Sequence, residues 1–259
     1  MKSSLLLALA VCGLLMPRTA QAVACGQVDD FEDGTTMGWT EGPISPNQPT
    51  NVANGGPSGV GDNYLRNFSS GGVGAGSRMV MFNTLQWAGD YLAAGVTRIE
   101  ADMANFGATA LSMRIAIERN IGGRYGSTNA VALPADGQWH RVTFDLTSAD
   151  LSLISGLATL NDVLANVGEL RILSATAGPT WQGDAIVATL GVDNITAVVV
   201  GDCDVDGDVD LDDYADFEPC LRGPGGGLAA GCGCADLDCD NDADLRDFAA
   251  LQIALPGGP

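Results

Sequence analysis

The stretch Asp202-Cys-Asp-Val-Asp-Gly-Asp-Val-Asp-Leu-Asp-Asp213 returns 34 residues later as Asp236-Leu-Asp-Cys-Asp-Asn-Asp-Ala-Asp-Leu-Arg-Asp247. Both copies place aspartates at positions 1, 3, 5, 7, 9 and 12 of a twelve-residue loop. Carboxylates this close together repel one another, and a divalent cation relieves that repulsion. Because the ligand positions hold hard oxygen donors and neither histidine nor thiolate, the pattern favours calcium over zinc or copper. The alternative is a solvated acidic tail, and two copies in the same phase argue against it.

The spacing is that of an EF-hand loop, in which positions 1, 3, 5, 9 and 12 offer side chains and position 7 offers a backbone carbonyl. Position 6 needs a residue that tolerates a sharp turn, and it holds Gly207 in the first loop and Asn241 in the second. After each loop we expect a short amphipathic helix, over 211–218 and 245–255, each ended by a proline. Residues 201–259 therefore form a duplicated loop–helix unit.

This unit resembles a dockerin of type I, the small α-helical calcium module that plugs into cohesin domains. The resemblance implies two calcium ions, one in each loop. Many dockerins have a Ser/Thr pair at positions 10 and 11, where the partner is contacted, and here these positions hold Leu211-Asp212 and Leu245-Arg246. The resemblance implies a cohesin-like partner. Because the contact positions differ, another cell-surface protein is the alternative partner. The implied calcium ligands are Asp202, Asp204, Asp206, Asp208, Asp210 and Asp213 in the first loop, and Asp236, Asp238, Asp240, Asp242, Asp244 and Asp247 in the second.

The charge of the chain limits its partners. The 259 residues carry a formal charge of −20, which argues against nucleic acid and anionic membrane surfaces. The charge is concentrated, because residues 201–259 contain fourteen Asp and one Glu against two Arg. The 35 glycines and the scarcity of lysine favour an extracellular, mainly β body over a helical enzyme.

Residues 1–22 have the layout of a secretory signal peptide. Lys2 precedes an apolar run over 5–16, and Ala20-Gln-Ala22 gives a small-residue cleavage site. No other segment is a transmembrane candidate. We therefore expect a secreted or cell-surface protein. The alternative to free secretion is a lipoprotein box that ends at Cys25 and leads to a lipid anchor there.

Export permits disulfides, and six cysteines remain once Cys12 is removed with the signal peptide. Five of them lie in the acidic unit, at 203, 220, 232, 234 and 239. We interpret them as staples for a unit too small to bury a large core. The sequence leaves their pairing open.

Residues 23–200 are predicted to form one antiparallel β-sandwich or jelly roll. Trp139-His-Arg-Val-Thr-Phe-Asp-Leu146 alternates between two faces, with Val142 and Phe144 on the apolar one. Short stretches of this kind, separated by turn residues, are typical of such folds. We place the last strand beside the N-terminal one, expect mostly loops with short strands over 43–77, and expect a turn or short helix over 149–167. The expected strands are 77–82, 96–103, 111–118, 129–133, 139–146, 170–174 and 185–200.

This body resembles carbohydrate-binding jelly-roll modules in two short motifs. They are Asp30-Phe-Glu-Asp-Gly34, followed by Gly38-Trp39, at the start and Val192-Asp-Asn-Ile195 at the end. The resemblance implies one structural calcium shared by Glu32 and Asp193. The alternative is that Phe31 and Trp39 are ordinary core residues and Glu32 is a surface residue.

The sequence lacks a complete catalytic pair. Glu100-Ala-Asp102 matches the start of a Glu-x-Asp-x-x-Glu strand motif of sandwich glycoside hydrolases, but Asn105 occupies the third acidic position. His140, the only histidine, has no nucleophile motif beside it and is interpreted as structural. Trp39 and Trp139 are expected in the core. The aromatic residues expected at loops or strand ends, and hence as sugar-stacking candidates, are Trp87, Tyr125 and Trp181, with Tyr91 beside them.

These features together predict a secreted, non-catalytic protein that works in polysaccharide catabolism. The sandwich binds a glycan, and the calcium unit attaches the protein to a partner or to the cell surface. Two alternatives stay open: a sandwich glycoside hydrolase or lyase that carries a dockerin, and a structural or adhesion protein of the cell surface without a sugar ligand.

Overall fold

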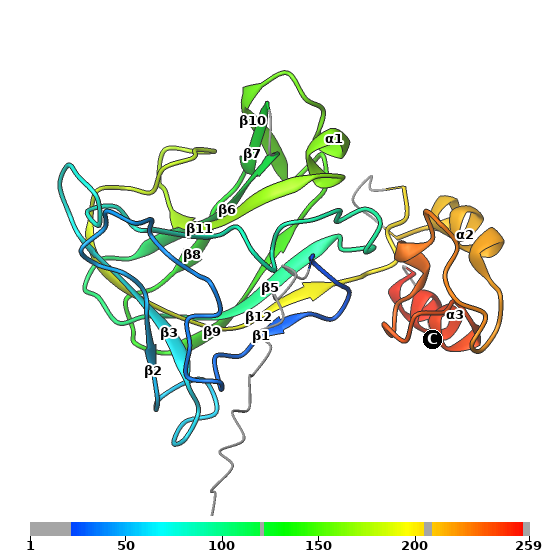
Figure 1. Cartoon of the computed structure of the whole chain (residues 1–259), viewed down its shortest axis with the longest axis horizontal. Helices are drawn as coiled ribbons and strands as arrows, with labels where there is room; N and C mark the ends of the chain where they lie inside the picture. Colours follow the sequence, from blue (N-terminus) through cyan, green and yellow to red (C-terminus); the bar gives the residue numbers. More distant parts are fainter. Residues whose placement is uncertain (1–21, 120–121, 205–208, 256–259) are drawn as a thin grey trace, which may run out of the picture.

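The computed structural model describes residues 22–119, 122–204 and 209–255 of the chain. Residues 1–21 of the predicted signal peptide lie outside this range. The described residues form two packed β-sheets, and a small helical unit sits beyond the end of the long strand β12 (Figure 1). The prediction of a mainly β, antiparallel two-sheet body is confirmed.

The first sheet contains six strands, all antiparallel to their neighbours. Strand β1 pairs with β12 off the main path, with Val28 opposite Thr196. This pairing confirms the prediction that the last strand lies beside the N-terminal one. In order across the sheet the strands are β2 (Thr50–Val52), β3 (Tyr64–Ser70), β12 (Val187–Val198), β5 (Arg98–Asn105) and β9 (Trp139–Asp145), with β1 (Val28–Asp29) beside β12.

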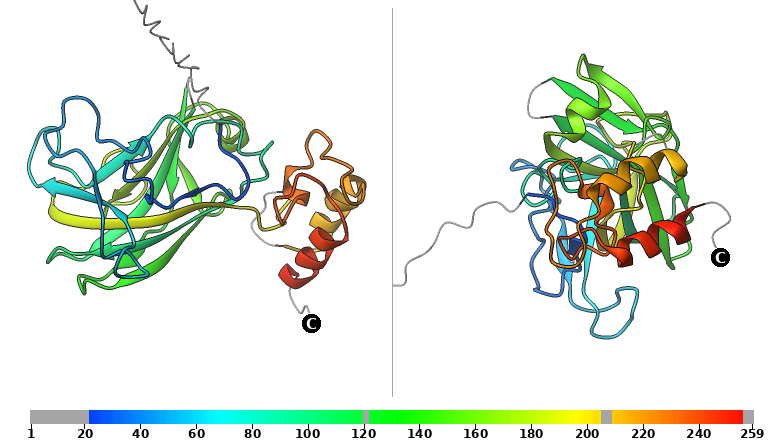
Figure 2. Two further views of the ribbon diagram at one scale, coloured as in Figure 1. Left: turned by 60° about the horizontal axis from the view of Figure 1, so that its bottom comes forward. Right: turned by 90° about the vertical axis from the view of Figure 1, so that its right-hand side faces the viewer.

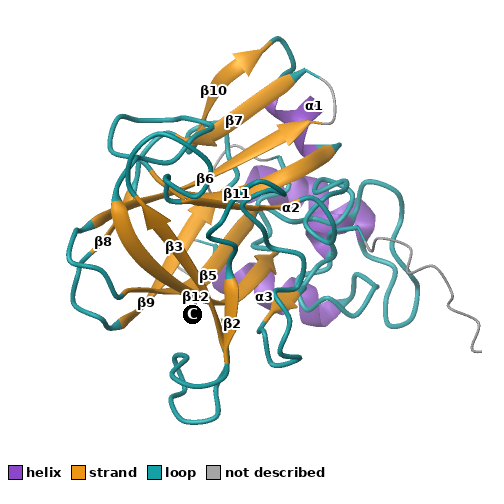
Figure 3. Ribbon diagram, turned by 60° about the vertical axis from the view of Figure 1, so that its left-hand side comes forward, coloured by secondary structure: helices purple, strands orange, loops and turns teal. Residues whose placement is uncertain are grey.

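The second sheet also contains six antiparallel strands, and the two layers face each other (Figure 3). Helix α1 (Leu160–Leu164) precedes β11, within the region expected to hold a turn or short helix. In order the strands are β10 (Leu151–Gly156), β7 (Gly123–Ser127), β6 (Leu111–Arg119), β11 (Val167–Ser174) and β4 (Val80–Asn83), with β8 (Val131–Leu133) paired to β6.

The core between the sheets is built from alternating apolar side chains of the strands and from aromatic residues of the connecting segments. Trp39 and Trp87 both donate their indole N–H to the buried carboxylate of Asp29, each at 2.7 Å. Burial raises the pKa of the Asp29 carboxyl although these two indole donors and Gln86 favour its charged form. Phe31 and Trp39 are core residues, as their motif suggested.

The C-terminal unit contains two helices, α2 (Leu211–Phe217) and α3 (Leu245–Ala254), and two short 3-10 turns, Glu218–Cys220 and Gly233–Ala235. The helices begin where the sequence predicts and end within one residue of the expected positions. The ring of Tyr214 on α2 contacts the equivalent ring of Phe248 on α3, with centroids 5.8 Å apart. Together with Phe217 and Leu251 these rings form a small core of the unit's own.

The helical unit lies beside one end of the sandwich (Figure 2). Disulfides join it to the sandwich and also bond it internally. Its own disulfides join Cys203 to Cys234 and Cys220 to Cys232. A third disulfide joins Cys25, at the start of the sandwich, to Cys239 inside the second acidic loop. Because the Cys25 sulfur is used in this bond, the alternative of a lipid anchor on Cys25 is not compatible with the structure. Three disulfides are consistent with an extracellular setting.

The backbone of the unit also meets the sandwich directly. Gly95 lies so close to Gly233 that a β-carbon on either glycine would overlap the other's backbone. Within the described ranges, no helix has both the length and the apolar character needed to cross a bilayer.

Candidate metal centres and a surface groove

The two acidic loops have the same internal hydrogen bonds, centred on the aspartate at position 12. In the first loop Asp213 accepts from the backbone N–H of Cys203 (2.6 Å) and Asp204 (3.3 Å) through Oδ1, and from that of Asp210 (2.7 Å) through Oδ2. In each loop the position-12 carboxylate thus holds the backbone of positions 2, 3 and 9 around itself.

In the second loop Asp247 accepts from the backbone N–H of Leu237 (2.8 Å), Asp238 (3.1 Å) and Asp244 (2.8 Å). The position-9 residues, Asp210 and Asp244, are also the N-caps of α2 and α3. The loop and the start of the following helix are therefore one structural element in both copies.

The carboxylates of the loops are gathered into three groups, in each of which three ligand oxygens lie within 4.8 Å of one another. An ionised carboxylate is costly to bury without a counter-charge. The side chains also leave one buried oxygen, Oδ1 of Asp242, without a hydrogen-bond partner. Among the described loop aspartates, those more than nine-tenths buried are Asp202, Asp213, Asp236, Asp242, Asp244 and Asp247.

The carboxylates of the second loop raise one another's pKa. Burial raises the pKa of the Asp236 carboxyl, and the neighbouring charges of Asp247 and Asp240 raise it further. Burial likewise raises the pKa of Asp238, and the same two neighbours contribute. A bound cation would lower these pKa values, and a set of carboxylate oxygens suits Ca²⁺.

The turn residues of the second loop behave as the sequence predicts. Asn241, at position 6, has a φ of +67°, the left-handed conformation that this position requires. Cys239, at position 4, has a φ of +60° and is the residue bonded to Cys25. The matching part of the first loop, residues 205–208 with the predicted ligands Asp206 and Asp208 and the turn residue Gly207, lies outside the described residues.

A second acidic group lies in the sandwich and contains both residues predicted there. Asp193 is 1% exposed, and its Oδ2 is buried without a partner. Burial raises the pKa of Asp193 to about 7, and the charges of Asp62, Asp102 and Glu32 add to the shift. Glu32 in turn accepts from the backbone N–H of Asn63 at 2.7 Å. Asp62 and Asp102 were not predicted, because no spacing in the sequence relates them to Glu32 and Asp193.

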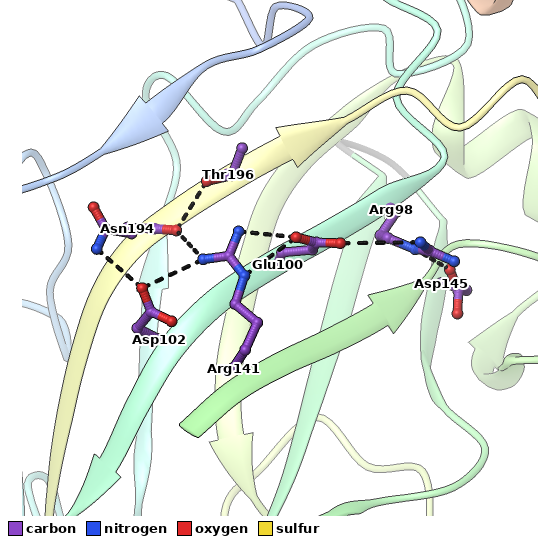
Figure 4. A network of polar contacts seen from close by, with 7 residues as sticks. All are labelled: Arg98, Glu100, Asp102, Arg141, Asp145, Asn194 and Thr196. Atoms are coloured by element: carbon purple, nitrogen blue, oxygen red, sulfur yellow. Dashed lines mark hydrogen bonds and ion pairs between the residues drawn. The ribbon is translucent and has the colours of Figure 1, made fainter. Parts of the chain in front are cut away.

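The carboxylates of Glu100 and Asp102 point from β5 toward arginine (Figure 4). Arg141 contacts Glu100 at 2.8 Å and Asp102 at 3.4 Å, and Arg98 pairs with Asp145 at 2.6 Å. These side chains are one-fifth to two-fifths exposed, so each pair contributes little to stability. The network does, however, pair both β5 carboxylates with an arginine side chain.

The structure corrects the assignment of the sugar-stacking aromatics. Trp87, predicted at a loop surface, is fully buried, as is Tyr91, because both fill the end of the core that the short connecting segments enclose. Trp181 is only 9% exposed and lies between two guanidinium groups, 4.0 Å from that of Arg171 and 4.5 Å from that of Arg124. The ring faces of Trp181 are therefore already occupied.

Two further predicted positions differ in detail. Tyr125 is half-buried, and its hydroxyl donates to the Ala158 carbonyl at 3.1 Å. Trp139, expected in the core, is half-buried and forms a cluster with Tyr64 and Phe106, with ring centroids 5.4 to 5.8 Å apart. These three rings lie over Gly191, where a β-carbon would meet Phe106 and Trp139, so they cover the outer face of the first sheet.

A groove on the outer face of the first sheet contains residues that the sequence did not single out. It has a volume of about 340 Å³ and crosses β2, β3 and β12. Phe68, on β3, is 40% exposed and lines it, with Arg66 two residues away on the same face. The alternation of β3, with Leu65, Asn67 and Ser69 buried, was the signal that could have revealed these residues. The groove is lined by Asn47, Gln48, Thr50, Arg66, Phe68 and Thr189.

Of the comparisons with known proteins, only the one with solved structures found similar chains. No family model matches the chain, and no curated protein matches it either. An exo-beta-agarase is similar over 67% of this chain and 24% of its own, with 14% identity and a TM-score of 0.46. This chain thus corresponds to about a quarter of the agarase.

Two carbohydrate-binding modules show a similar likeness. The family 11 module from Clostridium thermocellum, in complex with a beta-1,3-1,4-mixed-linked tetrasaccharide, covers 67% of this chain and 95% of its own at 16% identity and a TM-score of 0.42. The CBM22-1 xylan-binding domain from Paenibacillus barcinonensis Xyn10C covers the same shares at 13% identity and a TM-score of 0.40. At such values no residue of the present sites is assigned from these proteins.

Proposed function

We propose that this chain is a secreted, non-catalytic glycan-binding protein whose C-terminal unit binds two calcium ions and attaches it to a partner. The observation that carries the proposal is the pair of aspartate loops, alike in sequence and in the hydrogen bonds of position 12, which gather carboxylate oxygens within 4.8 Å of one another. The proposal has three parts: the metal, the partner and the glycan.

The calcium part follows from the donor set. The residues that would hold the ions are the predicted loop aspartates, with position 7 contributing a backbone oxygen. Calcium would neutralise the buried carboxylates and fix each loop against the helix that follows. Glu32 and Asp193 are the residues that would hold a further ion in the sandwich, and the unpartnered Asp193 oxygen supports this assignment.

The partner part follows from exposed leucines at equivalent places. Leu211 and Leu245 occupy position 10 of the two loops and are 73% and 75% exposed. Ile253, on α3, is 75% exposed. Large apolar side chains that stand out symmetrically beside a metal loop are suited to contact with another protein. A dockerin-like role, with a cohesin-like or cell-surface partner, accounts for them.

The glycan part rests on the groove of the first sheet. A half-exposed ring (Phe68) among amide, hydroxyl and guanidinium groups (Asn47, Gln48, Thr50, Arg66) is the combination that binds a sugar through stacking and hydrogen bonds. The pairing of both Glu100 and Asp102 with Arg141, and the amide at Asn105, support a binding role rather than hydrolysis by this strand.

The test is a calorimetric calcium titration of the oxidised mature chain, residues 23–259, beside Asp213→Ala and Asp247→Ala. The whole chain is needed because Cys239 pairs with Cys25, which a fragment 201–259 would lack. We expect each variant to lose one ion of the pair that the loops bind. Titration without saturable binding would contradict the proposal for the C-terminal unit.

The glycan part is tested separately by affinity electrophoresis in a panel of soluble polysaccharides, with Phe68→Ala as the variant. We expect at least one polysaccharide to slow the migration of the natural chain, and to slow that of Phe68→Ala less. Release of reducing sugar or of unsaturated product from the same panel would contradict the non-catalytic role.

A further inference from the structure

A second pocket lies next to the groove of the first sheet, on the other side of one loop. This second pocket, about 320 Å³ in volume, opens between the β3–β4 connection and the second sheet. The loop between the two is held in shape by a bond from Ser45 Oγ to Glu41 at 2.7 Å and by one from Asn47 Nδ2 to the Gly76 carbonyl at 2.7 Å. Asn47 lines the groove and Gly76 lines the pocket, so the two depressions meet at this contact.

Each of the two depressions contains an arginine without a carboxylate partner. Arg98, Arg124, Arg141 and Arg171 all pair with acidic side chains of the sandwich. By contrast, none of the carboxylates that the structure describes forms an ion pair with Arg66 in the groove or with Arg78 in the pocket. Arg78 donates from Nη1 to the Gly183 carbonyl at 2.9 Å, which fixes its guanidinium at the pocket rim.

Arg171 gives the pocket a further guanidinium that is held in place. It lies 5.1 Å from the ring centroid of Phe82 and 4.0 Å from that of Trp181, and it donates from Nε to Glu169 at 2.5 Å. A planar cation held between two rings loses little conformational entropy when it contacts a ligand. The Trp181 ring thus serves to position an arginine.

The acidic residue of the pocket, Glu41, opposes this positive charge only in part. Burial raises the pKa of its carboxyl to about 7, so near neutral pH a large fraction of it is protonated. Its Oε1 is buried without a hydrogen-bond partner. The pocket is therefore lined by two guanidinium groups, of which that of Arg171 is paired with Glu169 and that of Arg78 with no carboxylate of the described residues.

We propose that the groove and the pocket form one continuous binding path for an anionic polysaccharide, whose carboxylate or sulfate groups are bound by Arg66 and Arg78. In this assignment Phe68 stacks on a sugar ring in the groove, and the chain then passes over the Asn47–Gly76 contact into the pocket. Guanidinium groups bind carboxylate and sulfate oxygens in a bidentate manner, and both unpaired arginines stand where a glycan in the groove would pass. The inference rests on the proposed glycan-binding function and specifies its ligand class.

The experiment measures binding of three soluble oligosaccharide probes by calorimetry: an oligogalacturonate, a sulfated galactan oligosaccharide and a neutral mixed-linked β-glucan oligosaccharide. The proteins are the oxidised mature chain, Arg66→Ala, Arg78→Ala and the double variant. Arg222→Ala, which removes an exposed arginine of the C-terminal unit, is the control with the same charge change. Unchanged thermal unfolding establishes that the variants are folded.

We expect at least one anionic probe to bind at least about tenfold more tightly than the neutral one, and affinity to fall as NaCl is raised. Each single arginine variant should lose about tenfold, the double variant more, and Arg222→Ala nothing. Whether the carboxylated or the sulfated probe binds better identifies the source of the charge.

Two results would overturn the inference and leave the proposed function standing. One is equal binding of the neutral probe with no effect of either arginine variant. The other is binding of the anionic probes that disappears in Asp213→Ala or Asp247→Ala but not in the arginine variants, because the loop calcium would then be the contact. Binding of no probe by any of the proteins would overturn the glycan function and this inference together.

Discussion

The two acidic loops share a sequence pattern and differ in how they are anchored. The first loop is bonded through Cys203 to Cys234, which lies within the same unit. The second is bonded through Cys239 to Cys25, at the beginning of the sandwich. The position-12 hydrogen bonds are the same in both loops, whereas the bridging cysteine stands at position 2 in the first loop and at position 4 in the second. A duplicated motif can thus keep its local structure while one copy also connects two parts of a protein.

The largest expected effect comes from removing this connection. Cys25→Ser/Cys239→Ser should lower the free energy of unfolding by about 3–5 kcal/mol, because the bond closes a loop of 214 residues and such loops lose the most chain entropy. Urea unfolding without reductant measures it.

The matched control is Cys220→Ser/Cys232→Ser, whose bond spans 12 residues and should contribute less, about 2–3 kcal/mol. A larger loss in the control than in the long-range pair would mean that the unit stays on the sandwich without its covalent bond.

The next effect concerns the metal. If both loops bind calcium, saturating the ions at about 100 times Kd should stabilise the unit by about 2–3 kcal/mol per site. Asp247→Ala should abolish the second site alone, and Asp213→Ala the first alone. Calcium-dependent thermal shifts of both variants measure this. In Cys25→Ser/Cys239→Ser we expect weaker calcium affinity in the second loop only, and equal weakening of both loops would contradict the role of the anchor.

A smaller effect is expected in the sandwich, at Asp193→Asn. In excess chelator this variant should be about 1–2 kcal/mol more stable than the natural chain at pH 8, because a buried unpaired carboxylate is replaced by a neutral amide. In calcium the order should reverse, since the amide is a weaker ligand. Chemical unfolding in both buffers tests the prediction, and a variant less stable under both conditions would argue against a cation there.

The smallest effect concerns pH. The folded pKa of Glu41, raised to about 7, lies above its unfolded value near 4.5, so the folded state binds more protons between these values. The associated stability is complete below about pH 4.5 and is lost as the pH rises through 7. Glu41→Gln should therefore remove on the order of 1 kcal/mol of the pH dependence between 5 and 8. Unfolding curves across this range, with Glu218→Gln as an exposed-site control, measure it.

The parts of the fold that were predictable are those with a regular period and a partner close in sequence. Strands with clean alternation, such as β9 and β5, and both helices lie where expected, since capping aspartates and apolar spacing act locally. Strands β7 and β10 were missed, and β3 lies in the stretch 43–77, where only short strands among loops were expected. These strands contain glycine, serine or arginine, and their local composition is therefore that of a loop. Their side chains become buried only when the neighbouring strands pack beside them.

For the candidate sites, residue spacing in the sequence predicted which carboxylates belong together, whereas the burial of aromatic side chains could not be predicted. The loop aspartates and the Glu32–Asp193 pair could be named because their motifs are compact. Trp87 could not be distinguished from a surface ring, because its burial depends on Asp29, which lies 58 residues away and accepts its indole N–H. The groove and the pocket join residues of separate strands and loops, and no one-dimensional pattern relates Arg66 to Arg78.

The bond between Cys25 and Cys239 also turns residues 25–239 into a covalent ring. A protease that cuts once anywhere between these residues, for instance in the glycine-rich connector around Gly225, opens the ring without releasing a fragment. In an environment rich in secreted proteases, the sandwich and the C-terminal unit would travel together after such a cut. Electrophoresis of the nicked protein should show one band without reductant and two with it.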